Sequence, residues 1–229
     1  MIKDEYRQSS KVSARMNVVA RRTPEQTRSE ILAAAWDLFR QLGARTTIAD
    51  IAEKLGMSSA NIYRFFPSKQ ALTEAICVNQ LGALIDAARA ASEGAGSAAE
   101  RIRATIATLH HAMRDQMLNQ SRVHEIVDVA MNEQWPAIDE FHQRCTEIIA
   151  RLIAEGQARG EFGPGDPAML GMQTLIACAA TYHPTLIAQC PEPDVGMRPE
   201  DIVAFALRAL ANQSPDQAPP APTTGETAP

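Results

Sequence analysis

Apolar residues recur every three or four positions along most of the chain, which is the period of an amphipathic α-helix. The first such stripe lies between Thr23 and Gly43 and includes Ile31, Phe39 and Leu42. Thr23 can cap the first turn of this helix, and Gly43 can end its last turn. Long alternating runs of Val, Thr and Tyr, which are typical of strands, are missing from the sequence. The pattern therefore predicts an all-α protein.

Two short helices are predicted directly after the first one. Thr47 can cap the earlier helix, which ends at Gly56, and Ser58 can cap the later one, which is expected to end at about Phe65. Because only Met57 separates Gly56 from Ser58, the turn between them is tight. The apolar side chains expected to pack inward here, against Leu38, Phe39 and Leu42, are Ile51, Ala52, Leu55, Met57, Ile62 and Phe66.

The helical period continues through the rest of the chain. Ser68 can cap a long helix that reaches about residue 91, and Ser97 with Glu100 can form the capping box of the next. Further helices are predicted over residues 123–130, 136–160, 167–181 and 199–211. The last two are apolar on most faces, so they need cover from the rest of the subunit or from a second copy of the chain.

Charge is divided unevenly along the chain. The whole protein has a net charge of -5, but residues 1–72 carry +5 and residues 73–229 carry -10. All four lysines precede residue 70. This asymmetry indicates that the first segment meets a polyanion such as DNA, although a solvated basic arm would give the same count.

The two short helices and the preceding helix are typical of a helix-turn-helix, whose second helix can enter the DNA major groove. Asn61 can pair with adenine through its amide, and the small side chains beside it permit close approach to base edges. Basic and tyrosine side chains nearby can reach phosphates. The candidate DNA-binding residues are Arg28, Arg45, Thr47, Ser58, Ser59, Ala60, Asn61, Tyr63, Arg64 and Lys69. An ordinary helical hairpin with a solvated face would show the same spacing.

The run TTIADIAEKLGMSSANIYRFFPSKQAL, residues 46–72, resembles the DNA-binding signature of the TetR family of bacterial transcription regulators. By this resemblance, Thr47, Tyr63 and Lys69 contact the DNA backbone, and Ser59, Ala60 and Asn61 lie where family members touch bases. Two departures from the family pattern bear on which DNA sequence the protein recognises. Ser59 stands where the family often has Lys, Pro or Arg, and Phe65 stands where it often has His or Tyr, so no relative's base preference can be transferred.

Composition, apolar period and the resemblance together predict four segments. They are a basic arm over residues 1–22, a helix-turn-helix domain over 23–68, a larger ligand-binding and dimerisation domain over 69–213, and a tail over 214–229. The tail has five prolines in sixteen residues and no large apolar side chain, so we expect it to be disordered. The arm either lies in a DNA minor groove or is simply solvated.

The same resemblance implies a homodimer formed through the last two helices, bound to a near-palindromic operator and released by a small, often apolar effector. The protein would then be a repressor, with an activator of the same fold as the alternative. The expected ligand-binding residues are Leu109, Met113, Val127, Met131, Trp135, Phe141 and Met172. Plain core packing would explain the same apolar stripes.

Other functions have less support in the sequence. The four cysteines are far apart and no histidine pair has ligand spacing, so neither a metal nor another cofactor is expected. A helical enzyme using Glu133, Asp139, Glu140 and His142, or a protein-binding scaffold, remains an alternative, but no known catalytic motif is present. The sequence also lacks a secretory signal and a membrane-spanning segment, which predicts a cytoplasmic protein with no membrane partner.

Overall fold

The computed structural model describes residues 22–119, 129–189 and 198–211, and every regular element in these ranges is a helix. The helix-turn-helix region contains α2 (Pro24–Leu42), the 3-10 turn η2 (Gly43–Arg45), α3 (Ile48–Leu55) and α4 (Ser59–Tyr63). The larger domain contains α5 (Lys69–Ser92), α6 (Ala98–Asn119), α8 (Pro136–Ala158), α9 (Pro167–Ala177), α10 (Ala179–Tyr182), α11 (Pro184–Gln189) and α12 (Pro199–Ala211). The predicted fold class is confirmed.

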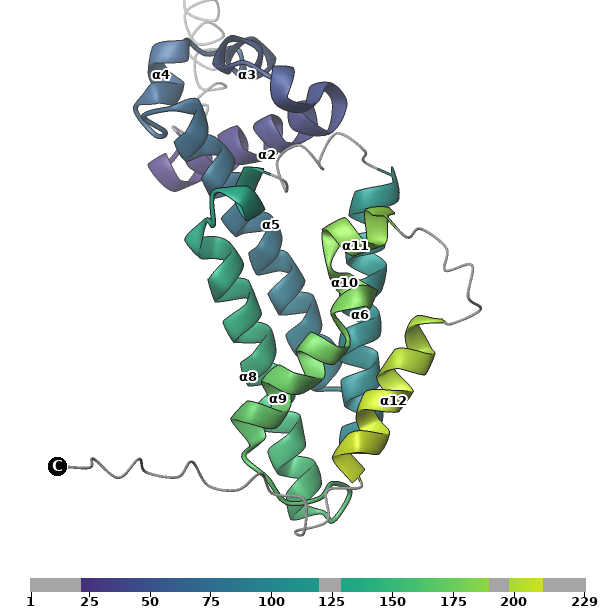
Figure 1. Cartoon of the computed structure of the whole chain (residues 1–229). Helices are drawn as coiled ribbons and strands as arrows, with labels where there is room; N and C mark the ends of the chain where they lie inside the picture. The colour runs from purple at the N-terminus through teal and green to yellow at the C-terminus, as the bar shows by residue number, and fades with distance from the viewer. Residues whose placement is uncertain (1–21, 120–128, 190–197, 212–229) are drawn as a thin grey trace, which may run out of the picture.

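The helices form two groups along one long axis (Figure 1). Helices α2, α3 and α4 gather at one end of α5, and α5, α6 and α8 run beside one another away from that end. The helices α9 to α12 cover the remaining side of α6 and α8. Helix α5 therefore connects the two groups.

The first apolar core lies inside the helix-turn-helix region. Phe39 of α2, Ile51 of α3 and Ile62 of α4 are each at most 1% exposed, and Phe66 closes the core at 2%. Lys54 on α3 adds a 3.1 Å ion pair with Asp37 on α2. Leu72 and Ile76 in the first turns of α5 belong to the same core, so the DNA-binding helices are fixed to the start of this helix.

The second core fills the space between α5, α6, α8 and the helices that cover them. At its far end Glu155 on α8 accepts hydrogen bonds from Arg101 on α6 (2.6 Å) and from Arg151 (3.0 Å). The two arginines also donate to Ser92 at the end of α5, to its carbonyl and its hydroxyl respectively. This network joins the ends of three helices. Trp36 on α2 packs against both cores and so links the two groups of helices.

The predicted helix caps are confirmed in detail. Thr23 and Gln26 form a reciprocal capping box, and so do Thr47 and Asp50. The hydroxyls of Ser58 and Ser68 accept the expected backbone N–H groups.

Three details differ from the sequence prediction. Leu42 is 39% exposed because it lies in the last turn of α2, so it does not join the core. Helix α4 ends at Tyr63, two residues early. The predicted helix 167–181 is interrupted at Cys178, where the backbone turns, and α10 and the unpredicted α11 follow. The arm up to residue 21, the predicted helix over 123–128 and the tail lie outside the described residues.

Candidate functional site

The turn between α3 and α4 sets the direction of the candidate recognition helix. Gly56 has φ +63° and ψ 36°, a left-handed conformation that glycine adopts without the steric cost of a Cβ atom. Its N–H donates to the carbonyls of Ala52 and Glu53, and the N–H of Met57 donates to Ala52 at 3.0 Å. These bonds close the last turn of α3. As a result, only three residues separate the end of α3 from the start of α4.

Helix α4 presents one side to the core and the other to solvent. Ile62 is completely buried, whereas Tyr63 is 48% exposed and Ala60 and Arg64 are also exposed. The exposed side is the one that a DNA groove can reach. Burial of Ile62 therefore determines which residues of this short helix are available for contact with DNA.

Two of the expected base-reading residues are only half exposed. Ser59 and Asn61 are partly buried, and the Asn61 amide donates to Met57 Sδ at 3.6 Å. Arg64 in turn donates to Asn61 Oδ1 at 3.4 Å. Both contacts are weak, the first because a thioether sulfur is a poor acceptor and the second because it is long. Asn61 can exchange them for a base edge at little cost.

The expected phosphate-binding residues are exposed, but three of them, Arg28, Lys69 and Thr47, have local partners. The Arg28 guanidinium lies 4.8 Å from the centre of the Phe66 ring. Lys69 Nζ donates to the Ala44 carbonyl at 2.6 Å, which ties the start of α5 to the turn before α3. Arg45 is exposed in that same turn.

Besides its expected phosphate contact, Thr47 forms hydrogen bonds within the first turn of α3. Its hydroxyl and its N–H each donate to Asp50 Oδ2 at 2.8 Å. These two hydrogen bonds lower the pKa of Asp50, and the charge of Lys69 lowers it further. The Asp50 carboxylate is therefore held at the first turn of α3, where the helix dipole favours a negative charge.

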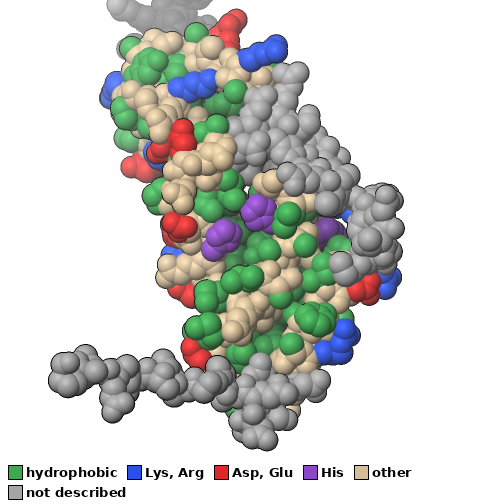
Figure 2. All heavy atoms as spheres, in the orientation of Figure 1, with side chains coloured by type: hydrophobic (Ala, Val, Ile, Leu, Met, Phe, Trp, Pro, Cys, Tyr) green, Lys and Arg blue, Asp and Glu red, His purple; other side chains and the backbone are tan. Residues whose placement is uncertain are grey.

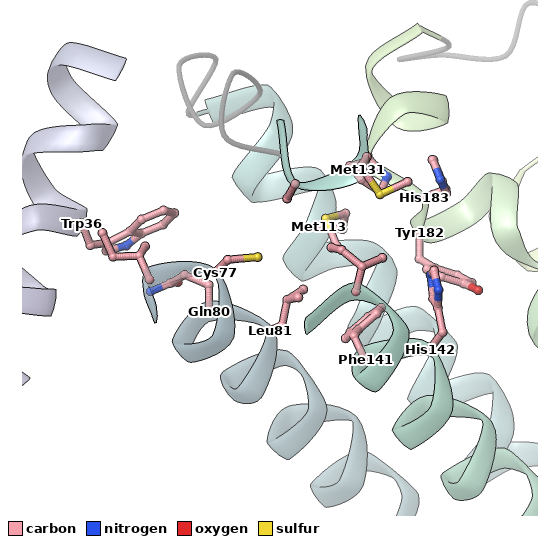
Figure 3. A pocket seen from close by; sticks show the side chains of 14 residues that line it. Trp36, Cys77, Gln80, Leu81, Met113, Met131, Phe141, His142, Tyr182 and His183 are labelled. Carbon is pink, nitrogen blue, oxygen red and sulfur yellow. The ribbon is translucent and has the colours of Figure 1, made fainter. Parts of the chain in front are cut away.

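An apolar cavity of about 70 Å³ lies below the helix-turn-helix region, where α2 meets the larger domain. Figure 3 shows Trp36, Cys77 and Gln80 at one end and His142, Tyr182 and His183 at the other. The complete lining is Trp36, Ile76, Cys77, Gln80, Leu81, Met113, Ala130, Met131, Ile138, Phe141, His142, Tyr182, His183 and Pro184. No Asp, Glu, Lys or Arg occurs among these lining residues.

The structure brings together only some of the expected ligand-binding residues. Met113, Met131 and Phe141 line the cavity. Leu109 instead lies in the core at 1% exposure, and Trp135 lines a separate hollow beside Phe39 and Lys69. Met172 is 42% exposed on α9, so it points away from the interior. Val127 lies outside the described residues.

Sequence reasoning missed Trp36 at one end of the cavity and His183 at the other. Trp36 was overlooked because the core stripe of its helix consists of Ile31, Ala35 and Phe39, and Trp36 lies beside that stripe. His183 was overlooked because α11 was not predicted, although a His-Pro pair within an apolar segment marks a break. Among the described residues, no group of three or more His, Cys, Asp or Glu side chains could hold a metal ion. In the same ranges, no helix is long and apolar enough to cross a lipid bilayer.

A helix-turn-helix joined to a helical domain with an internal apolar cavity defines a DNA-binding regulator of the one-component class. Comparison with known proteins indicates the same class of protein. Residues 31–76 match the family described as "Bacterial regulatory proteins, tetR family", and residues 98–203 match "Tetracyclin repressor-like, C-terminal domain". The two matches together cover about two thirds of the chain. The protein belongs to the TetR family of bacterial transcriptional regulators.

Individual relatives are distant. The chain is 27% identical over 143 residues to the HTH-type transcriptional regulator UidR of Escherichia coli K12, which covers 61% of this chain and 71% of UidR. It is 24% identical over 146 residues to the HTH-type transcriptional repressor KstR2 of Mycolicibacterium smegmatis, covering 62% and 70% of the two chains. The crystal structure of a TetR/AcrR family regulator from Thermobifida fusca superposes with a TM-score of 0.54 at 27% identity, covering 82% of this chain and 97% of that one.

Proposed function

We propose that this regulator is a repressor that binds a near-palindromic operator as a homodimer and is released when a small, mainly apolar ligand enters the cavity. The observation that carries the proposal is the composition of the cavity wall. Trp36 comes from the DNA-binding region, whereas Met113, Phe141 and His183 come from the larger domain. A molecule in this cavity touches both parts at once.

The proposed DNA contacts follow from exposure. Ser58, Ser59, Ala60 and Asn61 occupy the start of α4 and are assigned to base edges. Arg28, Arg45, Thr47, Tyr63, Arg64 and Lys69 lie around them and are assigned to phosphates and to positioning. For Lys69 this requires exchange of the Ala44 carbonyl for a phosphate oxygen.

The proposed dimer uses the exposed apolar side of α9 and α12. Met169, Met172 and Ile176 are spaced three and four residues apart on α9, so they share one face, and they are 47%, 42% and 66% exposed. Phe205 on α12 is 63% exposed. Hydrophobic side chains gather in the lower part of the face shown in Figure 2, where α9 and α12 lie in Figure 1. A symmetric pairing of this face would place two recognition helices about 34 Å apart, or a multiple of that, along one side of the DNA.

Release of the protein from the operator follows from the small size of the cavity. A volume of about 70 Å³ is far below the ~300–1,000 Å³ typical of sites that enclose a drug-sized molecule, so such a ligand has to widen it. Met113 and Met131 can rearrange at low cost. Further widening separates Trp36 and α5 from α6 and α8. A ligand that prefers the widened state shifts the population away from the DNA-bound arrangement.

Fluorescence anisotropy with DNA from upstream of the protein's own gene tests the proposal. We expect tight binding that falls steeply with salt and that exceeds binding to scrambled DNA. Asn61→Ala should reduce the preference for the specific sequence, while Gln70→Ala, which alters an exposed polar residue at the start of α5 outside the assigned set, serves as the control. Equal binding of the wild-type protein to both DNAs at every salt concentration would contradict operator recognition at this site.

A transcription assay with the same DNA separates repression from activation. A repressor lowers transcript yield from the promoter as protein is added, and an activator raises it. The name of KstR2 as a repressor supports the first outcome. Because a transcriptional regulator acts on chromosomal DNA, we place the protein in the bacterial cytoplasm.

A further inference from the structure

We propose that His183 and His142 form the polar end of the cavity and select a ligand that carries one carboxylate on an apolar body. This inference rests on the proposed function, because it names the chemistry of the effector for the same cavity.

Most polar groups of the cavity wall are already used or unsuited to bind a charge. The Tyr182 hydroxyl donates to the Leu175 carbonyl at 3.2 Å, and burial raises the pKa of this phenol well above its usual range. Burial also raises the pKa of the Cys77 thiol to about 11, so it stays protonated and uncharged near neutral pH. Gln80 lies at the opposite end, beside Trp36. The two histidines are therefore the side chains of the lining that remain to bind a polar group of a ligand at this end.

His183 is held in place by its backbone but has a free ring nitrogen. Its N–H donates to the Ala179 carbonyl at 2.8 Å, and its carbonyl accepts from Ile187 at 3.0 Å. Pro184 restricts its backbone to the extended region, which is observed at φ -71° and ψ 124°. Nδ1 of its ring is buried without a hydrogen-bond partner. A buried polar atom in this state costs free energy that a ligand can recover by bonding to it.

His142 supplies a second imidazole at the same end (Figure 3). Its side chain is exposed, so this end of the cavity faces the surface, and histidine side chains are visible among hydrophobic ones in the middle of the face in Figure 2. Burial lowers the pKa of His183, and the neighbouring charge of His142 lowers it further. An anion beside both rings would offset the repulsion from His142.

A carboxylate fits these features better than other polar groups. Its two oxygens can serve two imidazoles, whereas a hydroxyl offers only one oxygen. An ammonium group would find no carboxylate among the lining residues. A sugar would need several more hydrogen-bond partners than this wall offers. The apolar body of the ligand would then extend toward Trp36.

Binding assays with matched short compounds test this inference. Straight-chain carboxylates from butyrate to decanoate are each compared with the alcohol and the amine of the same length. The emission of Trp36 in a Trp135→Phe variant reports binding, since these are the only two tryptophans. We expect the best carboxylate to bind about tenfold more tightly than its alcohol and the amine to bind least.

Variants test whether the two histidines cause the preference for a carboxylate. His183→Phe and His142→Gln should each weaken carboxylate binding about tenfold and leave the alcohol nearly unchanged. His111→Gln is the control, because His111 is exposed and lines a different hollow, between α6 and α12. His183→Gln keeps a hydrogen-bonding side chain and checks that any loss is not simply unfolding.

The pH dependence of binding gives an independent readout. A bound carboxylate raises the pKa of His183 relative to the free protein, so binding takes up a proton and should tighten as pH falls from about 8 to 6. Among the described residues, the titratable groups at the same end of the wall as His183 are His142 and Tyr182, and Cys77 lies toward the opposite end. His110 on α6 lies close by, with its Nδ1 2.5 Å from the Thr181 carbonyl. Beyond Thr181, in the separate hollow, lie the charged side chains Arg103, Glu200 and Asp201. The pH effect should vanish in His183→Phe and persist in His111→Gln.

Two outcomes would overturn the inference. They differ in whether they also contradict the ligand part of the proposed function. Equal binding of alcohol and carboxylate with no effect of His183→Phe would exclude the polar end but leave the cavity as an apolar ligand site. Absence of binding by every compound at every length would exclude both the inference and the ligand part of the proposed function, while operator binding would be untouched.

Discussion

At the scale of single residues, Tyr63 is an assigned DNA-contacting side chain that is 48% exposed. It lies at the end of α4, next to the completely buried Ile62, so its ring cannot turn into the core. Tyr63→Phe removes one hydroxyl. We expect it to weaken DNA binding by about 1 kcal/mol, roughly fivefold, to the same extent on operator and scrambled DNA, because a phosphate contact carries no sequence information. Anisotropy titrations on both DNAs measure this, and loss confined to the operator would show a base contact instead.

Glu155 gives a residue-scale prediction about stability. Its carboxylate accepts hydrogen bonds from Arg101 and Arg151, and the bond from Arg101 is the main cause of its lowered pKa. Because the side chain is a third exposed, solvent screens the pair, and we expect Glu155→Gln to lower the free energy of unfolding by only about 1 kcal/mol at pH 7.

The sign of the pH effect follows from the direction of that shift. A carboxyl group whose pKa is lower in the folded protein stabilises the fold above its usual pKa of 4.5 and loses this contribution as pH falls below it. The difference between wild type and Glu155→Gln, measured by urea unfolding, should therefore shrink below about pH 4.5. Glu147→Gln is the matched control on α8, since Glu147 only accepts a hydrogen bond from Gln143. A difference that stays constant down to pH 3 would contradict this account.

At the scale of secondary-structure elements, two glycines have the same free space but opposite roles. A Cβ atom at Gly56 or at Gly82 would meet nothing within 4 Å. Gly56 has φ +63° in the turn between α3 and α4, whereas Gly82 lies inside α5. We expect Gly56→Ala to destabilise the protein by about 1 kcal/mol through backbone strain, and Gly82→Ala to stabilise it by about 0.5–1 kcal/mol through helix propensity. Thermal unfolding of the two variants measures this, and equal signs would contradict the backbone argument.

The sequence was sufficient to predict most helices because caps and apolar periods are local signals. Thr47, Ser58 and Ser68 each form the predicted cap. The region after α9 was predicted less well, because the all-apolar segment around Cys178 has no polar face that would reveal a change of direction. The cavity could be predicted only in part, because its wall combines Trp36 with side chains more than 140 positions later, such as His183. Such contacts depend on how the helices pack, which no local pattern specifies.

At the scale of the whole molecule, the proposed function assigns DNA binding to one group of helices and ligand binding mainly to the other. Residues 1–72 carry a net charge of +5, of which residues 1–22 supply +4 and residues 23–72 supply +1, whereas residues 73–229 carry -10. The acidic part is repelled by DNA, so electrostatic steering should bring the helix-turn-helix end to the duplex first. Trp36 connects that end to the cavity by direct contact with both cores, which gives a ligand a short route to the DNA-binding helices.

The dimer proposed for α9 and α12 makes the last prediction. Ile176 is 66% exposed on the apolar face of α9, so Ile176→Glu would place a charge in the centre of the proposed contact without disturbing the folded monomer. We expect the dimer to weaken by about 3 kcal/mol or more, since the carboxylate would be buried without a partner. Operator affinity should fall with it, and the slope of log affinity against log salt should drop to about half, because a monomer contacts one half-site and releases half as many counterions. Val78→Glu is the control, as Val78 is 55% exposed on α5, away from both helices. Sedimentation equilibrium measures the association, and a dimer of Ile176→Glu as tight as that of wild type would place the subunit contact elsewhere on the molecule.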